Sequence, residues 1–190
     1  MSKLFCYRIR ELQKKTEGIL IKEKLPLDVL RDFLPSLEFD IEHCTVELDA
    51  HLVMHQRDYI GCKGIIQCTL STNCHRCLEP ALFLLDIPIQ VLFLPQWEQD
   101  DSLPKQPKDL EIDDTSGDES VVDVSFHDGE WVDLVPYLKE QILLMLPLQI
   151  FCKEDCLGIC QKCGTNRNEK ACECEQTELH SFSFRLGGAS

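Results

Sequence analysis

Three segments of the chain alternate between apolar and polar residues with the period of two that is typical of β-strands. In residues 43–54 and again in residues 59–70 the apolar side chains fall mainly on the even-numbered positions, and in residues 81–94 they fall mainly on the odd-numbered ones. The four residues at 55–58 have the composition of a hairpin turn. We therefore expect the first two segments to pair as antiparallel strands.

Two further features concern the strands. Pro88 lies inside the third segment, and its missing N–H would interrupt a ladder of hydrogen bonds. That segment should therefore be an edge strand or contain a bulge. A shorter apolar stretch at residues 4–9 predicts a fourth strand.

Two segments have the pattern of helices. Residues 26–34 begin with one proline and stop just before another, which suits a short helix. A longer helix should begin at Asp133, whose carboxylate can cap it, and should end at Pro147. Its apolar stripe has helical spacing and consists of Val135, Leu138, Ile142 and Met145. The predicted fold is therefore α+β: an antiparallel β-meander packed with an amphipathic helix, followed by a small cysteine-rich tail.

Composition indicates a globular chain with one unusual segment. The 190 residues are 44% hydrophobic and carry a net charge of −14. Twelve of the acidic residues lie between positions 98 and 130, where only two lysines oppose them. Residues 96–120 also contain hardly any apolar side chains, so we expect a flexible acidic insertion there. The negative total disfavours a protein that simply coats RNA or DNA, because phosphate contacts need basic residues.

These patterns divide the chain into five parts. The expected parts are the N-terminal β-rich part of the body at 1–95, the acidic insertion at 96–120, the helical part of the same body at 121–150, the cysteine-rich metal-binding segment at 151–175, and a C-terminal tail at 176–190.

The compartment decides how the twelve cysteines are interpreted. The N-terminus lacks the apolar core of a secretory signal. The longest apolar run, residues 142–146, is too short to cross a bilayer, so we expect no membrane association. A cytoplasmic protein keeps its thiols reduced, and its cysteines should be core residues, metal ligands or redox centres.

Position separates the cysteines into two classes. Cys6, Cys44, Cys62 and Cys68 lie in predicted strands and should act as small buried hydrophobes. The other eight combine two Cys-x2-Cys pairs with further closely spaced cysteines, a pattern that strongly indicates metal. The predicted ligands are Cys74, Cys77, Cys152, Cys156, Cys160, Cys163, Cys172 and Cys174.

The eight thiols can be shared in two ways. The favoured partition joins Cys74 and Cys77 to Cys152 and Cys156 and leaves the last four cysteines as a second site, because one small ion could not reach both ends of the 152–163 segment if that segment were helical. The alternative joins the two Cys-x2-Cys pairs in a single ribbon-like site. Four sulfurs around one ion leave no position for substrate, so we expect two structural zinc ions.

Other chemistry is less well supported. An iron–sulfur cluster could use the same ligands, and Cys74 with Cys77 could form a redox pair, although no βαβ unit surrounds them. No nucleophile elbow, phosphate-binding loop, dinucleotide fingerprint or His-Glu-x-x-His motif occurs in the sequence. We therefore expect the protein not to be an enzyme.

Three motifs carry a family resemblance. Residues 74–80 read Cys-His-Arg-Cys-Leu-Glu-Pro, residues 133–147 form the predicted helix with its terminating Leu-Pro, and residues 152–174 contain the dense cysteines. Together they resemble the YceD-like family, the large ribosomal RNA subunit accumulation proteins.

The resemblance implies a bacterial or organellar ribosome-biogenesis factor that supports synthesis, processing or stability of large-subunit ribosomal RNA. A ribosomal protein or a large-subunit precursor would then be the partner, and the acidic segment could attract a basic protein. One alternative is an RNA-binding zinc module, and another is a thiol redox or metal-handling protein. The basic residues available for RNA are Arg76, Lys153, Lys162, Arg167 and Lys170.

Overall fold

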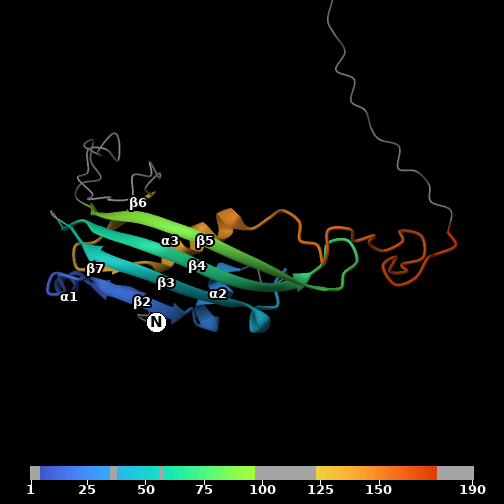
Figure 1. Ribbon diagram of the computed structural model, residues 1–190, viewed down its shortest axis with the longest axis horizontal. Coiled ribbons are helices and arrows are strands. Elements are labelled where there is room, and N and C mark those ends of the chain that lie inside the picture. Colours follow the sequence, from blue (N-terminus) through green and yellow to red (C-terminus); the bar gives the residue numbers. More distant parts are fainter. Residues whose placement is uncertain (1–4, 35–37, 56–57, 97–122, 175–190) are drawn as a thin grey trace, which may run out of the picture.

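The computed structural model describes residues 5–34, 38–55, 58–96 and 123–174. Most of these residues form a long, twisted five-stranded sheet with helices on one face, and a small two-stranded sheet lies beside it (Figure 1). The strands are β1 (Cys6–Arg8), β2 (Ile19–Lys24), β3 (Thr45–Met54), β4 (Ile60–Asn73), β5 (Pro80–Pro95), β6 (Asp123–His127) and β7 (Trp131–Asp133). The helices are α1 (Ile9–Leu12), α2 (Leu27–Phe33), the 3-10 helix η1 (Ile41–His43) and α3 (Val135–Met145).

The large sheet has the order β2-β3-β4-β5-β6. Its first four strands are antiparallel neighbours in chain order. The predicted pairing of the first two alternating segments is confirmed, with Met54 opposite Ile60 at the hairpin end. The last strand, β6, instead runs parallel to β5. The chain is therefore a mixture of helices and mainly antiparallel strands, as the sequence indicates.

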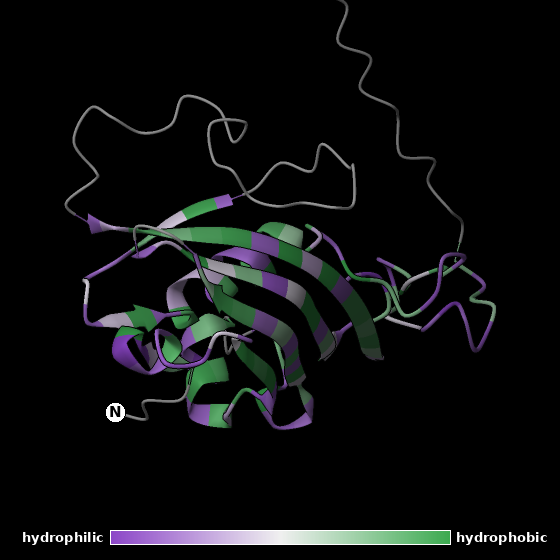
Figure 2. Cartoon of the chain, turned by 60° about the vertical axis from the view of Figure 1, so that its left-hand side comes forward, coloured by the Kyte–Doolittle hydropathy of each residue, from purple (hydrophilic) through white to green (hydrophobic). Residues whose placement is uncertain are grey.

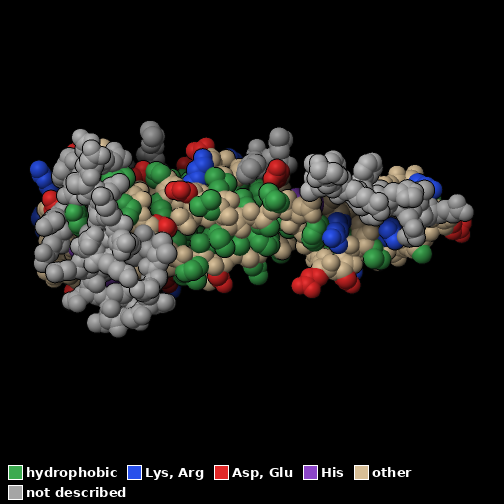
Figure 3. Space-filling view, turned by 90° about the horizontal axis from the view of Figure 1, so that it is seen from above, with side chains coloured by type: hydrophobic (Ala, Val, Ile, Leu, Met, Phe, Trp, Pro, Cys, Tyr) green, Lys and Arg blue, Asp and Glu red, His purple; other side chains and the backbone are tan. Residues whose placement is uncertain are grey.

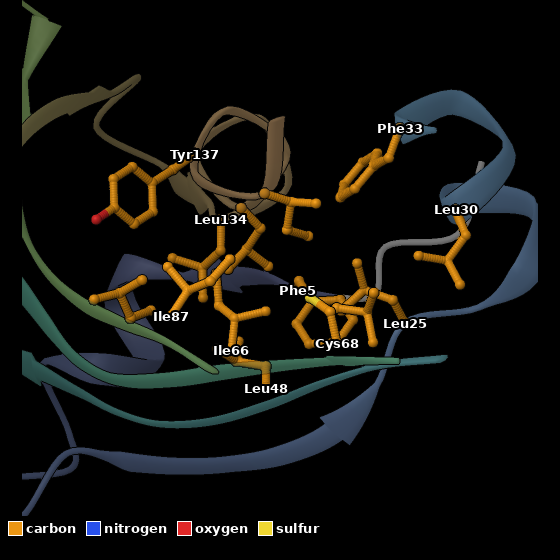
Figure 4. Close-up of a cluster of buried hydrophobic side chains, with 14 of the residues drawn as sticks. Phe5, Leu25, Leu30, Phe33, Leu48, Ile66, Cys68, Ile87, Leu134 and Tyr137 are labelled. Carbon is orange, nitrogen blue, oxygen red and sulfur yellow. The ribbon is translucent and has the colours of Figure 1, made fainter. Parts of the chain in front are cut away.

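The alternating positions place one face of the sheet in the core. Leu48, Ile66 and Ile87 lie on three adjacent strands and are all buried on this face. Helices α2 and α3 both cover it, and their apolar side chains meet those of the strands (Figure 4). Bands of polar and apolar residues alternate along the strands (Figure 2). The period-two pattern thus identifies the buried face correctly.

Tyr137 links α3 to β6, the strand at one edge of the large sheet. Its ring packs edge-on against Phe93 with the centroids 6.2 Å apart. Its hydroxyl donates a hydrogen bond of 2.7 Å to the carboxylate of Asp123 at the start of β6. Burial, followed by the contact with that carboxylate, raises the pKa of Tyr137 well above its usual value. The phenol therefore remains a donor at any physiological pH.

Three of the cysteines assigned to the core are buried there. Cys44, Cys62 and Cys68 are buried, and burial raises the pKa of both Cys62 and Cys68 to about 12. Their thiols are neutral and unreactive, as expected for structural cysteines. Cys6 is only partly buried in β1.

Some elements differ from those predicted. The fourth predicted strand is shorter than residues 4–9, because Ile9 begins α1, and it pairs with β7 rather than joining the large sheet. The sequence pattern did not predict β2. Only Ile21 of this strand is fully buried, and Lys22 and Lys24 pair across the strands with Asp49 and Glu47, so its sequence looks like that of a charged loop.

Helix α3 also begins later than predicted. Leu134 is the cap residue, although the carboxylate of Asp133 still accepts a 3.0 Å hydrogen bond from the N–H of Val135. Tyr137, Leu138 and Ile142 form its buried face. Met145, which the apolar stripe predicted to be inside, is the last residue of the helix and is 48% exposed.

Pro88 occupies the position that was predicted for it. Along its whole length β5 pairs with β4, but β6 pairs only with Val91–Pro95. Among the described residues, Pro88 therefore lies where β5 is an edge strand.

The predicted acidic insertion at 96–120 lies outside the described residues apart from Gln96. No helix in the described ranges is long and apolar enough to cross a membrane.

We expect α3 to contribute to stability mainly through its buried face. Ile142→Ala should lower the free energy of unfolding by about 2–5 kcal/mol, because it removes a fully buried side chain and leaves a cavity. Met145→Ala, on the same helix but half exposed, should cost less than about 1 kcal/mol. Urea unfolding of the metal-loaded protein measures both values. Equal costs for the two variants would contradict this assignment of the buried face.

Candidate metal centres

Four cysteines from two distant parts of the chain meet at one end of the sheet. Cys74 and Cys77 lie in the loop between β4 and β5, and Cys152 and Cys156 follow α3. Their four sulfur atoms all lie within 4.8 Å of one another. We call this group the first tetrad. It joins the tip of the β4–β5 hairpin to the segment that leaves α3 (Figure 1).

The spacing of these sulfurs suits a tetrahedral ion. A Zn–S bond of about 2.3 Å in tetrahedral geometry places neighbouring sulfurs about 3.8 Å apart. The Sγ atoms of Cys74 and Cys156 are 3.7 Å apart, and those of Cys77 and Cys152 are 3.5 Å apart. The four ligand groups are all thiols, and thiolates bind both zinc and the iron of iron–sulfur clusters. The first tetrad therefore could hold one metal ion without rearrangement.

The remaining four cysteines form a second group further along the chain. Cys160, Cys163, Cys172 and Cys174 also bring their sulfurs within 4.8 Å of one another. This second tetrad lies at the outermost end of the described chain, beyond the first tetrad (Figure 1). The structure thus groups the eight sulfurs as in the favoured partition. It does not bring Cys160 and Cys163 to Cys74 and Cys77, as the ribbon-like alternative requires.

The two Cys-x2-Cys loops have the same backbone turn. The N–H of Leu78 donates to the carbonyl of Cys74 over 2.9 Å, and the N–H of Gly164 donates to the carbonyl of Cys160 over 2.8 Å. Both residues have a left-handed backbone, with φ of 64° at Leu78 and 74° at Gly164. The turn directs backbone N–H groups toward the first sulfur of each pair, as the N–H of Arg76 shows with a 3.4 Å contact to the sulfur of Cys74.

These backbone donors favour the thiolate form of the first cysteine in each loop. Burial alone would raise the pKa of Cys74, but hydrogen bonds from the backbone of Cys77, Cys152 and Arg76 outweigh it and lower the pKa to about 6. Backbone hydrogen bonds from Cys163 and Lys162 lower the pKa of Cys160 to about 6 as well. Because thiolates are the metal-binding form of cysteine, Cys74 and Cys160 are prepared for a cation.

Arg76 holds the first tetrad together from outside. Its guanidinium donates a 3.2 Å hydrogen bond to the carbonyl of Cys156 and lies 4.1 Å from the ring centroid of Phe151. Its own carbonyl accepts the N–H of Ile159 over 3.0 Å. One arginine thus connects the hairpin loop to the tail at three places. The sequence assigned Arg76 to a basic surface, and only the fold shows these contacts.

Asn168 connects the two tetrads. It lies in the loop of the second tetrad, and its side-chain amide lies 3.4 Å from the sulfur of Cys156 in the first. Its carbonyl oxygen accepts the N–H of Leu157 over 2.8 Å. Sequence analysis missed this residue, since an asparagine in a polar loop carries no signal of such a contact.

The backbone near His75 adds a further connection. The N–H of His75 donates to the carbonyl of Ile150 over 2.9 Å. Residues 159 and 166 form an isolated antiparallel bridge within the tail. Beyond α3 the described chain contains no helix or strand longer than such a bridge. The shape of the tail therefore depends on turns, these hydrogen bonds and the two groups of thiols.

Comparison with known proteins gives a consistent result. A family model described as "Large ribosomal RNA subunit accumulation protein YceD" matches residues 62–184, a range that contains both tetrads. Among curated proteins, the chain is 24% identical over 150 residues to "Large ribosomal RNA subunit accumulation protein YCED homolog 1, chloroplastic" from Zea mays. The match covers 69% of this chain and 49% of that protein, so the chain spans about half the length of its relative. No solved structure matches.

We expect the purified protein to contain two zinc ions per chain. Cys77→Ser should lose about one of them, because three thiolates bind the ion more weakly, and should lose solubility as the hairpin loop separates from the tail. Cys68→Ser should keep both ions, since Cys68 is a buried core residue away from the tetrads. Elemental analysis of protein prepared without added metal measures the content. Less than one zinc per chain without iron would contradict two metal sites.

Asn168 should tune how firmly the first tetrad holds its ion. Asn168→Asp keeps the oxygen that accepts the N–H of Leu157 but replaces the amide donor with a second acceptor beside the sulfur of Cys156. Loss of such an outer contact typically lowers metal affinity by about 10–100-fold. A competition titration with a coloured chelator should show one ion released earlier and the other unchanged. Unaltered release of both ions would show that the contact does not matter for affinity.

Proposed function

The chain belongs to the YceD family, and from this membership we propose that it is a non-catalytic ribosome-biogenesis factor. In this proposal it supports the synthesis, processing or stability of large-subunit ribosomal RNA and binds two structural zinc ions. It acts in the compartment that contains the ribosomes, which is the cytoplasm or, as for the chloroplastic relative, an organelle.

The observation that carries the proposal is the family match over a range that includes both tetrads. Four thiolates around each ion would leave no coordination position for water or substrate, so the ions would hold the tail in shape rather than perform chemistry. Among the described residues no further group of His, Cys, Asp and Glu has the geometry of a metal site. These features support a protein that acts by binding.

The charge of the chain favours a basic protein partner over naked RNA. The net charge of −14 would repel phosphate and attract a ribosomal protein or a precursor particle through its basic components. Two of the five basic residues that could form an RNA surface already have partners. Arg76 contacts Phe151 and the carbonyl of Cys156, and Lys153 pairs with Asp155 over 3.7 Å.

The rest of the metal-bearing end carries both signs. Lys and Arg side chains are interleaved with Asp and Glu on the face seen from above (Figure 3). An RNA-binding zinc module would instead be expected to present a continuous basic area. We therefore place protein binding ahead of RNA binding.

Depletion of this protein should cause a selective deficit of large-subunit ribosomal RNA. Small-subunit RNA should be less affected, and quantifying both RNAs in depleted cells gives the ratio. Expression of the parent chain should restore that ratio, whereas Cys74→Ser combined with Cys77→Ser should not, because the first tetrad loses half its ligands. Cys6→Ser, which alters a partly buried cysteine outside both tetrads, is the matched control.

Each outcome of this experiment has a distinct meaning. A normal ratio on depletion would remove the ribosomal role. Full rescue by the double-serine chain would keep the role but show that the first metal site is dispensable for it.

A further inference from the structure

The two edges of the large sheet differ in their charge. At one edge, β2 carries Lys22, Glu23 and Lys24, and charged residues on an edge strand discourage pairing with another chain. At the other edge, β6 pairs with only the last part of β5. Residues 80–90 of β5 therefore have no strand on the side away from β4 in the described chain, and we call them the open edge. Asp86 is the one charged residue there.

The open edge is apolar on both faces of the sheet. Leu82 and Leu84 are 69% and 71% exposed on the outer face, and Phe83 and Leu85 are only partly buried on the inner face. Hydrophobic side chains gather along the middle of the molecule on the side where β5 lies above β4 in Figure 1 (Figure 3). A strand that is apolar on both faces is typical of the interior of a sheet. The open edge thus has the sequence of an interior strand but lacks a neighbour on one side.

Hydrogen bonding at the β4–β5 turn shows which backbone groups of β5 face outward. The N–H of Cys74 donates to the carbonyl of Glu79 over 2.8 Å, and this pair continues the register in which Asn73 faces Pro80. Only every second residue of an antiparallel strand bonds to a given neighbour. The odd-numbered residues of β5 therefore bond to β4, and the even-numbered ones face the open side. Pro88 agrees with this parity, because a proline cannot donate to the ladder.

The outward-facing donors are arranged symmetrically. Between Pro80 and Pro88 three N–H groups face the open side, those of Leu82, Leu84 and Asp86. No backbone acceptor of the described residues bonds to these three groups. The two prolines have no N–H and lie four residues before and four residues after Leu84. The donors and the prolines that bound them are therefore symmetric about Leu84.

This symmetry matches antiparallel pairing with a second copy of the same edge. When Leu84 lies opposite Leu84 of the copy, Leu82 lies opposite Asp86, and each of the three donors reaches a carbonyl of the other chain. Pro80 then lies opposite Pro88, so the pairing ends at both sides where neither chain has a donor to lose. A two-fold axis at Leu84 thus satisfies every outward N–H between the prolines.

The side chains fit the same register. On the inner face Phe83 of each copy lies opposite Leu85 of the other, so the partly buried side chains would cover each other. On the outer face the two Leu84 side chains meet at the axis. The two Asp86 carboxylates lie four residues apart along the paired strands and do not oppose each other. Packing and charge therefore both favour this arrangement.

We propose that the open edge of β5 pairs antiparallel with a second copy of this chain across a two-fold axis at Leu84, which joins the two five-stranded sheets into one. In this register Glu79 of the copy lies opposite Ile89, two residues before β6 begins to pair at Val91. The part of β5 that β6 leaves uncovered is therefore long enough for the copy. The proposal depends neither on bound metal nor on the ribosomal role.

Opposite charges introduced at Leu84 test the pairing in the full chain. Leu84→Lys and Leu84→Glu each place like charges opposite each other across the axis, whereas a mixture of the two variants places opposite charges there. The side chain is exposed in the single chain, so both variants should fold. Leu20→Lys, at an 81% exposed leucine on β2, is the matched control. Sedimentation velocity gives the dissociation constant of the dimer, and circular dichroism shows whether each variant keeps its sheet.

The parent chain and Leu20→Lys should form dimers, and Leu84→Lys or Leu84→Glu alone should dimerise at least about tenfold more weakly. The equimolar mixture should recover most of this loss, and recovery requires that both variants are folded. Leu84→Pro should also weaken the dimer, since it removes one outward N–H from each chain but no hydrogen bond to β4.

Three results would overturn the proposal. A parent chain that stays monomeric at all concentrations would leave the open edge for a strand of another protein or of this chain. A dimer that Leu84→Lys and Leu84→Pro do not weaken would place the contact elsewhere. A mixture of the charged variants that dimerises no better than either alone would show that Leu84 does not lie on the axis.

Discussion

The arrangement of the molecule depends on the closure of the first tetrad. Cys74 and Cys156 are 82 residues apart in the chain, and Cys77 and Cys152 are 75 apart, yet each pair of sulfurs lies within 3.7 Å. Contacts of His75 and Arg76 with Ile150, Phe151, Cys156 and Ile159 join the same two parts of the chain. Four thiols that converge in this way would repel one another as thiolates, so the proposed cation at their centre would supply the attraction that makes the closure favourable.

The segment after α3 makes this dependence plain. It contains no hydrophobic core of its own, and Cys156 and Ile150 are its buried apolar residues in the described chain. A segment of this size without helices, strands or a core cannot offset its conformational entropy by packing. The contacts of Arg76 and Asn168 orient the loops around the sulfur of Cys156 and its carbonyl. Under the proposal of two bound ions, folding of the tail and occupation of the tetrads are one process.

The sequence reveals elements whose burial is one-sided and regular. The period-two pattern identified β3, β4 and β5 and their buried face, because every second residue of these strands packs under α2 and α3. It missed β2, whose outer positions are occupied by charges that pair across the strands. It also missed β6, because a strand that joins parallel to β5 after a long connection leaves no local hairpin signal.

The candidate site likewise has some features that the local sequence reveals and others that depend on the fold. Cysteine spacing was enough to select the ligands and to favour their grouping, because reach along the chain limits which sulfurs can share an ion. The roles of Arg76 and Asn168 could not be found this way, since each acts across a large distance in sequence on an atom that the fold brings near.

The sheet and the segment after α3 are stabilised in different ways. The body is stabilised by a large apolar core and needs no metal to bury it, so it can hold the β4–β5 hairpin rigidly. The tail gains its shape from thiols and therefore has few side chains committed to packing, which leaves its aliphatic residues exposed at the far end of the molecule. Under the proposal of two structural ions, loss of an ion would disturb the segment after α3, whereas the apolar core of the body would remain.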